Sequence, residues 1–420
     1  MKRCVFLTIL ISWILFSCKE NSSDVVGEWE SSPLSGFVVI PINGGARITY
    51  DIPDDPEINY IEAQYIRKGK QYTEKSSIYK NEIIIEGFNT EDPVEATLYK
   101  VNRKGQRSKP VTIEFVPLIS PIKMIYNSLK LSTTFGGILA EWENSLQTEL
   151  GVRFMVDSMG VLETKKMYYT TIQSEKYNLR GFPDSLITFA VSLEDKWGNI
   201  SDTIVLTTKP YFETEIKKPY GDMRKSIPYD NITDLSGSLD FKRTYDGIVG
   251  NNNGFLTNPG SDGLSVTWDI GEVVKLSRIT LWPRAAEGWA VFASANVLEF
   301  EMWGVDKLDP SKLPPADISY WLDEWSVRNG VFSNVPSDFE LPETTFKDDW
   351  VYLGKYEVDR ELPPVPIITL GHTFEMPQSA DPVRYIRFYC HNSYGVSPPT
   401  NNYFAIGEIT FFGDNTVSQE

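Results

Sequence analysis

Residues 44–51 read GGARITYD and residues 136–143 read GGILAEWE, and this repeated stretch decides the fold of the first half of the chain. Two further pairs of short motifs recur at nearly the same distance: Gly87-Phe88 with Gly181-Phe182, and Lys104-Gly105 plus Ser108 with Trp197-Gly198 plus Ser201. The three offsets fall between 92 and 94 residues, so we infer two similar structural units in tandem.

Within these units, apolar and polar residues alternate in short runs such as 46–50 and 188–193. Alternation with a period of two is the pattern of a half-buried strand, and turn residues separate the runs. A unit of about ninety residues with short alternating strands is typical of a β-sandwich. We therefore predict two sandwiches, over residues 34–118 and 119–208.

The motifs also point to a family. A glycine pair, a strand with Trp or Tyr, a Gly-Phe pair and the turn pattern D-x-x-G-N-x-S at residues 195–201 together resemble the fibronectin type III fold. The resemblance implies that Tyr50 and Trp142, which occupy equivalent places, are core residues of their strands.

From about Lys209 the pattern changes, and prolines 210, 219 and 228 mark the start of a third region. Seven motifs follow in an order and spacing that resemble the discoidin (coagulation factor five/eight type C) domain: 245–247, 265–271, 276–284, 298–304, 349–354, 383–388 and 406–413. The resemblance covers residues 209–414 and implies a galactose-binding-like jelly roll, a fold that it shares with many carbohydrate-binding modules. Residues 415–420 form a short tail.

The whole chain is thus predicted to be all-β, with two tandem Ig/fibronectin-like β-sandwiches plus a C-terminal discoidin-like jelly-roll β-sandwich. One segment departs from the discoidin pattern: residues 307–347 form a long insertion rich in proline, Trp and acidic residues. An insertion of that size in a compact domain is often functional.

The first eighteen residues, MKRCVFLTILISWILFSC, indicate export. Lys2 and Arg3 precede an apolar run that is too short to span a bilayer and fits a signal peptide, residues 1–18. Its end, LFSC, resembles a bacterial lipobox, which implies lipidation of Cys18 and a flexible tether over 19–33; an ordinary secretory signal with an incidental Cys is the alternative. The chain resembles Bacteroidetes surface lipoproteins, which implies an outer-membrane, lipid-anchored location at the cell surface.

Charge and cysteine content narrow the class further. The formal net charge is −17, and becomes −19 once Lys2 and Arg3 are removed, so we expect no nucleic-acid binding. Of the three cysteines, Cys4 leaves with the signal and Cys18 would be lipidated, so Cys390 has no disulfide partner. The exported domains must therefore rely on their packed cores.

The sequence gives little support for catalysis. It has only two histidines, His372 and His391, and contains no nucleophile elbow, zinc-protease motif or phosphate-binding loop. Cys390 has the same strand parity as Ile386 and Phe388, which predicts a buried thiol rather than a nucleophile. With 57 acidic residues, pairs of carboxylates are expected by chance, so the presence of such a pair does not indicate a glycoside hydrolase. We predict that the protein is not an enzyme.

The discoidin resemblance implies one cofactor, a structural Ca²⁺ held between an early Asp-Gly turn and a glutamate on the last strand. The matching positions in this sequence are Asp246 and Glu408. Calcium prefers oxygen ligands of this kind. The alternative is that Asp246 merely belongs to a turn and that Glu408 is solvated.

The candidate ligand site starts from the stretch WPRAAEGWAVF, residues 282–292. Sugars are bound by aromatic rings that stack on their C–H faces and by polar side chains that meet their hydroxyls. Parity places Ile279 and Leu281 in the core and Trp282 on the opposite face of the strand. Pro283 then ends the strand, so that Trp282 and Arg284 lie where it enters a loop and Trp289 lies within that loop. Shell packing, with a salt-bridged Arg284, is the alternative for Trp282 and Arg284.

A second candidate cluster, His391, Asn392 and Tyr394, follows the strand that ends at Cys390. A third contribution could come from Trp321 and Trp325 in the insertion, although their i,i+4 spacing is more typical of a packing face. In discoidin-like modules such loops gather at one end of the sandwich.

We therefore predict a lipid-anchored, non-catalytic cell-surface protein that binds polysaccharide and supports glycan capture together with an outer-membrane transporter and surface enzymes. The alternatives are an adhesion or scaffold protein that binds another protein through its discoidin-like domain, and a glycan-active enzyme.

Overall fold

The computed structural model describes residues 29–417 except 52, 234–238, 259–261, 286–290, 294, 317, 337, 360–363 and 395–402. The predicted signal peptide, Cys18 and Trp289 lie outside the described residues. Strands predominate and are arranged in several sheets, which confirms the all-β prediction. No helix in the described part of the chain is both long and apolar enough to cross a membrane.

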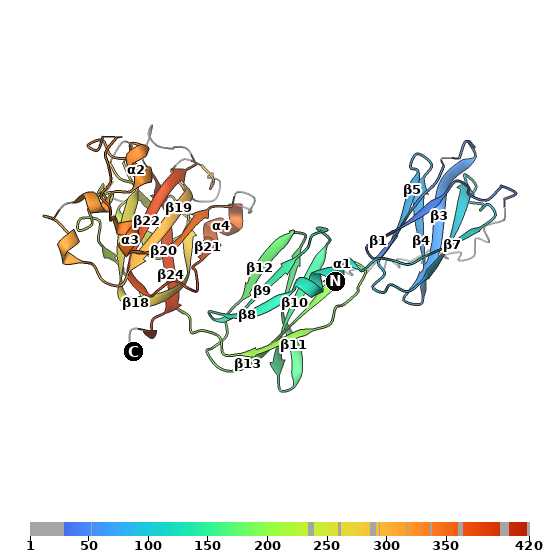
Figure 1. Cartoon of the computed structure of the whole chain (residues 1–420), viewed down its shortest axis with the longest axis horizontal. Helices are drawn as coiled ribbons and strands as arrows, with labels where there is room; N and C mark the ends of the chain where they lie inside the picture. Colours follow the sequence, from blue (N-terminus) through green and yellow to red (C-terminus); the bar gives the residue numbers. More distant parts are fainter. Residues whose placement is uncertain are drawn as a thin grey trace, which may run out of the picture. The chain divides into compact units, whose positions relative to one another are not determined.

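The first sandwich consists of two antiparallel sheets (Figure 1). Their alternating apolar residues, such as Ile48, Ile61, Ile85 and Leu98, are fully buried in one core. One sheet has the order β1(Val38–Ile42)-β2(Gly45–Thr49)-β5(Glu82–Glu86), and the other β4(Lys70–Ser77)-β3(Ile58–Arg67)-β6(Val94–Asn102)-β7(Val111–Phe115).

The second sandwich begins with the short helix α1 (Pro121–Ser128), which Ser120 caps. Trp142 is buried, as Tyr50 is in the first sandwich, which confirms the core positions predicted for both rings. The sheets have the orders β12(Ser174–Leu179)-β9(Gly137–Glu143)-β8(Lys130–Thr134) and β11(Val161–Thr170)-β10(Leu150–Ser158)-β13(Ile187–Asp195)-β14(Ile204–Thr208).

The sequence repeat corresponds to repeated hydrogen bonds. Phe88 N–H donates to the carbonyl of Gly44, and Phe182 N–H donates to that of Gly136, both at 3.0 Å. The next residue in each repeat must be glycine, because a Cβ on Gly137 would lie 1.8 Å from the carbonyl oxygen of Leu179. The repeated stretch therefore encodes a close approach of two backbones.

The terminal domain, which we define as residues 209–414, is organised by one long strand, β18 (Ser265–Trp282). The first half of β18 pairs with β16 and β22, and its second half pairs with β24 and β21, so that β18 belongs to two sheets. Gly271, at φ +88°, lies where the ladder is interrupted. The other strands are β15(Thr214–Glu215), β16(Gly221–Asp222), β17(Phe255–Leu256), β19(Val297–Val305), β20(Val351–Glu357), β21(His372–Glu375), β22(Val383–Ser393), β23(Ala405–Ile406) and β24(Glu408–Asp414).

The core of the terminal domain lies between these two sheets. Trp268, Phe388 and Phe411 are fully buried there, and the ring centroid of Trp268 lies about 6 Å from those of both phenylalanines. Cys390 joins Phe388 in this core, so the buried thiol predicted from strand parity is confirmed. Burial raises the pKa of Cys390 strongly, which keeps the thiol protonated.

The insertion packs on the face of β19 and β22 that points away from Phe388 and Cys390. Trp321 is buried, stacks on Phe346 and donates its indole N–H to the carbonyl of Lys312 at 2.7 Å. Phe346 in turn packs edge-to-face on Trp303 of β19. The helical turns of this region are Pro310–Lys312, Ile318–Trp321, α2(Glu324–Arg328) and α3(Phe346–Asp349). Trp321 and Phe346 thus belong to a second apolar cluster, whereas four other apolar residues of the insertion join the main core: Leu322, Val327, Val331 and Phe332.

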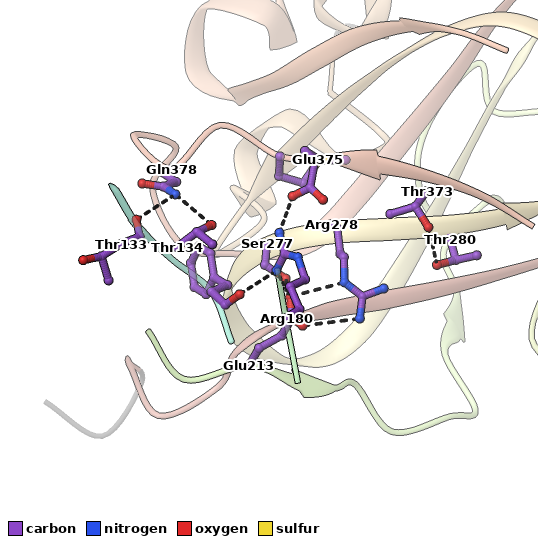
Figure 2. A network of polar contacts seen from close by, with 12 residues as sticks. Thr133, Thr134, Arg180, Glu213, Ser277, Arg278, Thr280, Thr373, Glu375 and Gln378 are labelled. Atoms are coloured by element: carbon purple, nitrogen blue, oxygen red, sulfur yellow. Dashed lines mark hydrogen bonds and ion pairs between the residues drawn. The ribbon is translucent and has the colours of Figure 1, made fainter. Parts of the chain in front are cut away.

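Charged residues gather where the chain enters the terminal domain (Figure 2). The Glu213 carboxylate accepts hydrogen bonds from Arg180 at 2.5 Å, from Ser277 at 2.5 Å and from Arg278 at 3.3 Å. Arg180 also pairs with Glu375 on β21. One carboxylate therefore neutralises two arginines, and the side chains of all three are at least four-fifths buried.

We expect Glu213→Gln to lower the free energy of unfolding by about 1–2 kcal/mol, because two partly buried guanidinium groups lose their shared counter-charge. Thermal unfolding monitored by intrinsic fluorescence measures the change. Glu215→Gln, at an exposed position on β15, is the control. Equal stability of the two variants would show that the network is dispensable.

Candidate functional site

An aromatic cluster forms around Trp282, the last residue of β18. The indole is partly exposed, and its N–H donates to the carbonyl of Thr369 at 3.1 Å, at the end of helix α4 (Pro364–Leu370). The ring lies against Gly371, where an added Cβ would come within 2.9 Å of it. Trp282 is therefore held in one orientation while part of its surface stays in contact with solvent.

Three more rings complete the cluster. Phe292 lies 5.6 Å from Tyr394 and 6.2 Å from His372, measured between ring centroids. The backbone N–H of Tyr394 donates to the carbonyl of Asn296 at 3.0 Å, and its hydroxyl donates to the carbonyl of Val358 at 3.4 Å. These bonds fix Tyr394 beside Phe292, so the cluster is preorganised.

The hollow between these rings is small. Trp282, Phe292, His372 and Tyr394 line a cavity of about 10 Å³, which is about the volume of one water probe. A sugar ring cannot enter it and could only lie across the partly exposed surfaces of Trp282 and Tyr394. Burial lowers the pKa of His372, so its imidazole is neutral at pH 7.

Arg284 adds a positive charge two residues beyond Trp282. Its backbone N–H donates to the side chain of Asn296 at 2.9 Å, which ties it to the loop that carries the cluster. Its Nε atom is buried without a hydrogen-bond partner among the described residues, and no ion pair within 4.0 Å joins it to a carboxylate there.

His391 and Asn392 do not join Tyr394. His391 is 5% exposed and lies on the face of β22 that the insertion covers, with its ring 4.3 Å from that of Trp325. Asn392 donates to Glu299 at 2.6 Å. Neither residue lines the cavity with Tyr394, because His391 faces the insertion and the Asn392 amide is bound to Glu299. Trp289, the other predicted contact, falls within residues 286–290, which the structure does not describe.

Asp246 and Glu408 lie close in space but face other partners. The Glu408 carboxylate accepts from the Lys218 ammonium and, at 3.1 Å, from the Gly247 N–H. Asp246 pairs with Arg243 at 2.9 Å and accepts from the Ile248 N–H at 2.9 Å. Burial raises the pKa of Glu408, and Lys218 opposes that rise.

This arrangement does not fit a calcium ion, which takes six to eight oxygen ligands. Among the described residues there is also no group of three or more His, Cys, Asp or Glu side chains that could hold a metal. The predicted calcium ligands are thus near each other, but their oxygens meet cations and N–H groups of the chain itself.

A buried polar layer under the insertion was not predicted from the sequence. Asp323 of the insertion accepts from the Tyr389 hydroxyl at 2.9 Å and pairs with Lys347 at 3.1 Å. Lys347 also pairs with Glu301, which lies 3.5 Å from His391. The only sequence signal for this layer is the strand parity shared by Arg387, Tyr389 and His391, which are all buried on this face.

A separate groove of about 480 Å³ runs along α2. Its apolar surface comes from Val327, Leu341 and Phe339, and the Phe339 side chain is among the exposed aromatics of the domain at 37%. Glu324 and Arg328 at its rim pair with each other at 2.5 Å on the surface. The groove carries an exposed ring that does not belong to the Trp282 cluster, so a variant of this ring can serve as a control for variants of the cluster.

Three family models match the chain, and all three families are described as domains of unknown function. The first, DUF4959, matches residues 31–117, the second, DUF5126, matches 118–219, and the third, DUF5000, matches 245–413. No curated protein matches the sequence.

Similar solved structures include the SusE-like protein BT2857, which is 20% identical with a TM-score of 0.37; the match covers 69% of this chain and 98% of that one. CBM32-3 from a family 31 glycoside hydrolase of Clostridium perfringens is 14% identical with a TM-score of 0.26, covering 44% and 90%. A two-domain fibronectin type III segment of chicken tenascin is 14% identical with a TM-score of 0.20, covering 42% and 99%. Identities this low leave the function to be argued from the residues of the chain itself.

Proposed function

We propose that the protein is a non-catalytic carbohydrate-binding protein of the cell surface, anchored by a lipid at Cys18, whose terminal domain binds polysaccharide. The observation that carries this proposal is the fixed aromatic cluster at the end of β18. Trp282 and Tyr394 are held by hydrogen bonds and are partly exposed, and Arg284 and Asn296 lie in the same loops.

The cluster suits a sugar because its exposed rings can stack on C–H faces while neighbouring polar groups meet hydroxyls. Its hollow is too small to enclose a ligand. The proposal therefore favours binding along an open surface, as a long polysaccharide requires, over capture of a small molecule in a pocket.

Affinity electrophoresis of the soluble chain, residues 19–420, against a panel of polysaccharides tests the proposal. We expect retardation by at least one glycan. A folded protein that no glycan retards would overturn the carbohydrate proposal, and binding to a protein partner instead would favour the adhesion alternative. Release of shortened oligosaccharides during incubation would contradict the non-catalytic part of the proposal.

Once a glycan is found, Tyr394→Ala should weaken its binding about tenfold, since loss of a stacked aromatic ring costs about 1.4 kcal/mol. Tyr394→Phe, which keeps the ring, should bind nearly as well as the unchanged chain. Isothermal titration calorimetry gives both affinities.

Phe339→Ala is the matched control, because it removes an exposed ring from the groove along α2 rather than from the cluster. It should leave the affinity unchanged. If Phe339→Ala abolished binding while Tyr394→Ala did not, the glycan site would lie on the insertion and its placement at Trp282 would be wrong.

A further inference from the structure

Glu408 is a carboxylate that needs a counter-charge. It is the first residue of β24 and is 1% exposed. A carboxylate withdrawn from water is costly unless a cation or several hydrogen-bond donors replace its hydration. The described residues around Glu408 supply both, and they come from distant parts of the sequence.

The cation is the Lys218 ammonium. It binds one Glu408 oxygen and donates to the Thr410 hydroxyl at 2.8 Å, so that it bridges two residues of β24. The side chain of Lys218 is only 20% exposed. The next apolar residue of its segment, Tyr220, is buried and packs on Phe411 of β24 at 5.1 Å, which holds the lysine in place.

The second Glu408 oxygen accepts the backbone N–H of Gly247 at 3.1 Å. Glu408 therefore connects three segments: the entry to the domain at Lys218, the Asp246-Gly247 turn and the last strand. The Asp246 oxygens bind other groups than Lys218, since one accepts from Arg243 and the other accepts from the Ile248 N–H.

We propose that the Lys218 ammonium is the resident cation of the terminal domain and takes the place of the calcium ion that the discoidin resemblance implies. The domain then assembles this junction without metal. Lys218 can fill the role because an ammonium offers three donors in a compact charge, and the carboxylates of Glu408 and Asp246 already meet cations and N–H groups of the chain.

Thermal unfolding of the chain 19–420, followed by fluorescence, tests the proposal directly. We expect millimolar Ca²⁺ and EDTA to leave the Tm of the unchanged protein the same. Lys218→Met should lower the Tm of the terminal domain by about 4–8 °C, because Glu408 remains buried without a counter-charge. Lys217→Met, at the exposed neighbouring position, should leave it unchanged.

The double variant Lys218→Met with Glu408→Gln distinguishes lost charge pairing from lost packing. It should recover part of the Tm, since it removes the unpaired charge. The proposal is overturned if Ca²⁺ raises the Tm of the unchanged protein by several degrees. It is also overturned if Lys218→Met costs no more than Lys217→Met, or if the double variant is less stable than Lys218→Met alone.

Discussion

Asp230→Asn should lower the free energy of unfolding of the terminal domain by about 3–5 kcal/mol, the cost of leaving a buried charge without its partner. The side chains of Asp230 and Arg387 are both fully buried, 3.5 Å apart. The Ser265 hydroxyl links them, since it donates to Asp230 at 2.7 Å and accepts from Arg387 at 3.0 Å. Burial raises the pKa of Asp230 and Arg387 opposes that rise, and asparagine preserves the shape of the side chain, so the loss measures how far the pairing with Arg387 outweighs the burial of the charge.

Urea unfolding followed by tryptophan fluorescence gives the change. Glu324→Gln is the matched control, because it breaks the exposed pair with Arg328, and such pairs contribute at most about 1 kcal/mol. The double variant Asp230→Asn with Arg387→Met should be more stable than Asp230→Asn alone. A loss below about 1 kcal/mol for Asp230→Asn would show that the aromatic rings of Phe346 and Trp321 over Arg387 compensate its charge by themselves.

The polar layer under the insertion predicts a second large effect, which depends on pH. Burial alone would raise the pKa of Glu301, but the His391 ring 3.5 Å away and the charge of Lys347 outweigh it and lower that pKa from 4.5 to about 2. A folded-state pKa below the unfolded-state value gives stability that is complete above about pH 4.5 and is lost as the pH falls to about 2. The shift corresponds to about 3 kcal/mol.

Glu301→Gln should therefore cost about 3 kcal/mol at pH 7 and almost nothing near pH 2. Urea unfolding at a series of pH values measures this convergence. Glu340→Gln, at an exposed position of the insertion, should have the same free energy of unfolding as the unchanged protein at every pH. If the free energy of unfolding of Glu301→Gln also differed from that of the unchanged protein by the same amount at every pH, Glu301 would not couple the insertion to the sheet through its charge.

Local alternation was enough to predict the strands and the residues of the main core. Cys390 is buried as its parity requires, because the side chains of a strand alternate between its faces wherever it lies. The burial of Trp142 followed from the fibronectin resemblance. The glycine pairs were also readable, since each marks a backbone contact that recurs in both sandwiches.

What covers the outer face of a strand could not be predicted in this way. His391 has the parity opposite to Cys390, which indicates exposure if nothing covers that face, but the insertion buries it against Trp325. The i,i+4 spacing of Trp321 and Trp325 suggested one helix. They lie in separate helical turns instead, because Asp323 caps the second one between them.

The candidate site was predicted only in part. Trp282 and Tyr394 line the same cavity, but Phe292 and His372 complete it through contacts that span up to about a hundred residues of sequence. The spatial proximity of Asp246 and Glu408 followed from the resemblance. The Lys218 ammonium between them did not, because a single lysine in a linker carries no sequence pattern.

The passage of β18 through both sheets has a consequence for how the terminal domain folds. Because the residues 265–274 and 275–282 belong to one strand, a slip of register in one ladder shifts the side chains presented to the other. The two sheets therefore cannot settle their pairing independently. We therefore expect the two sheets to unfold in one transition, because losing one of them removes the template for the other.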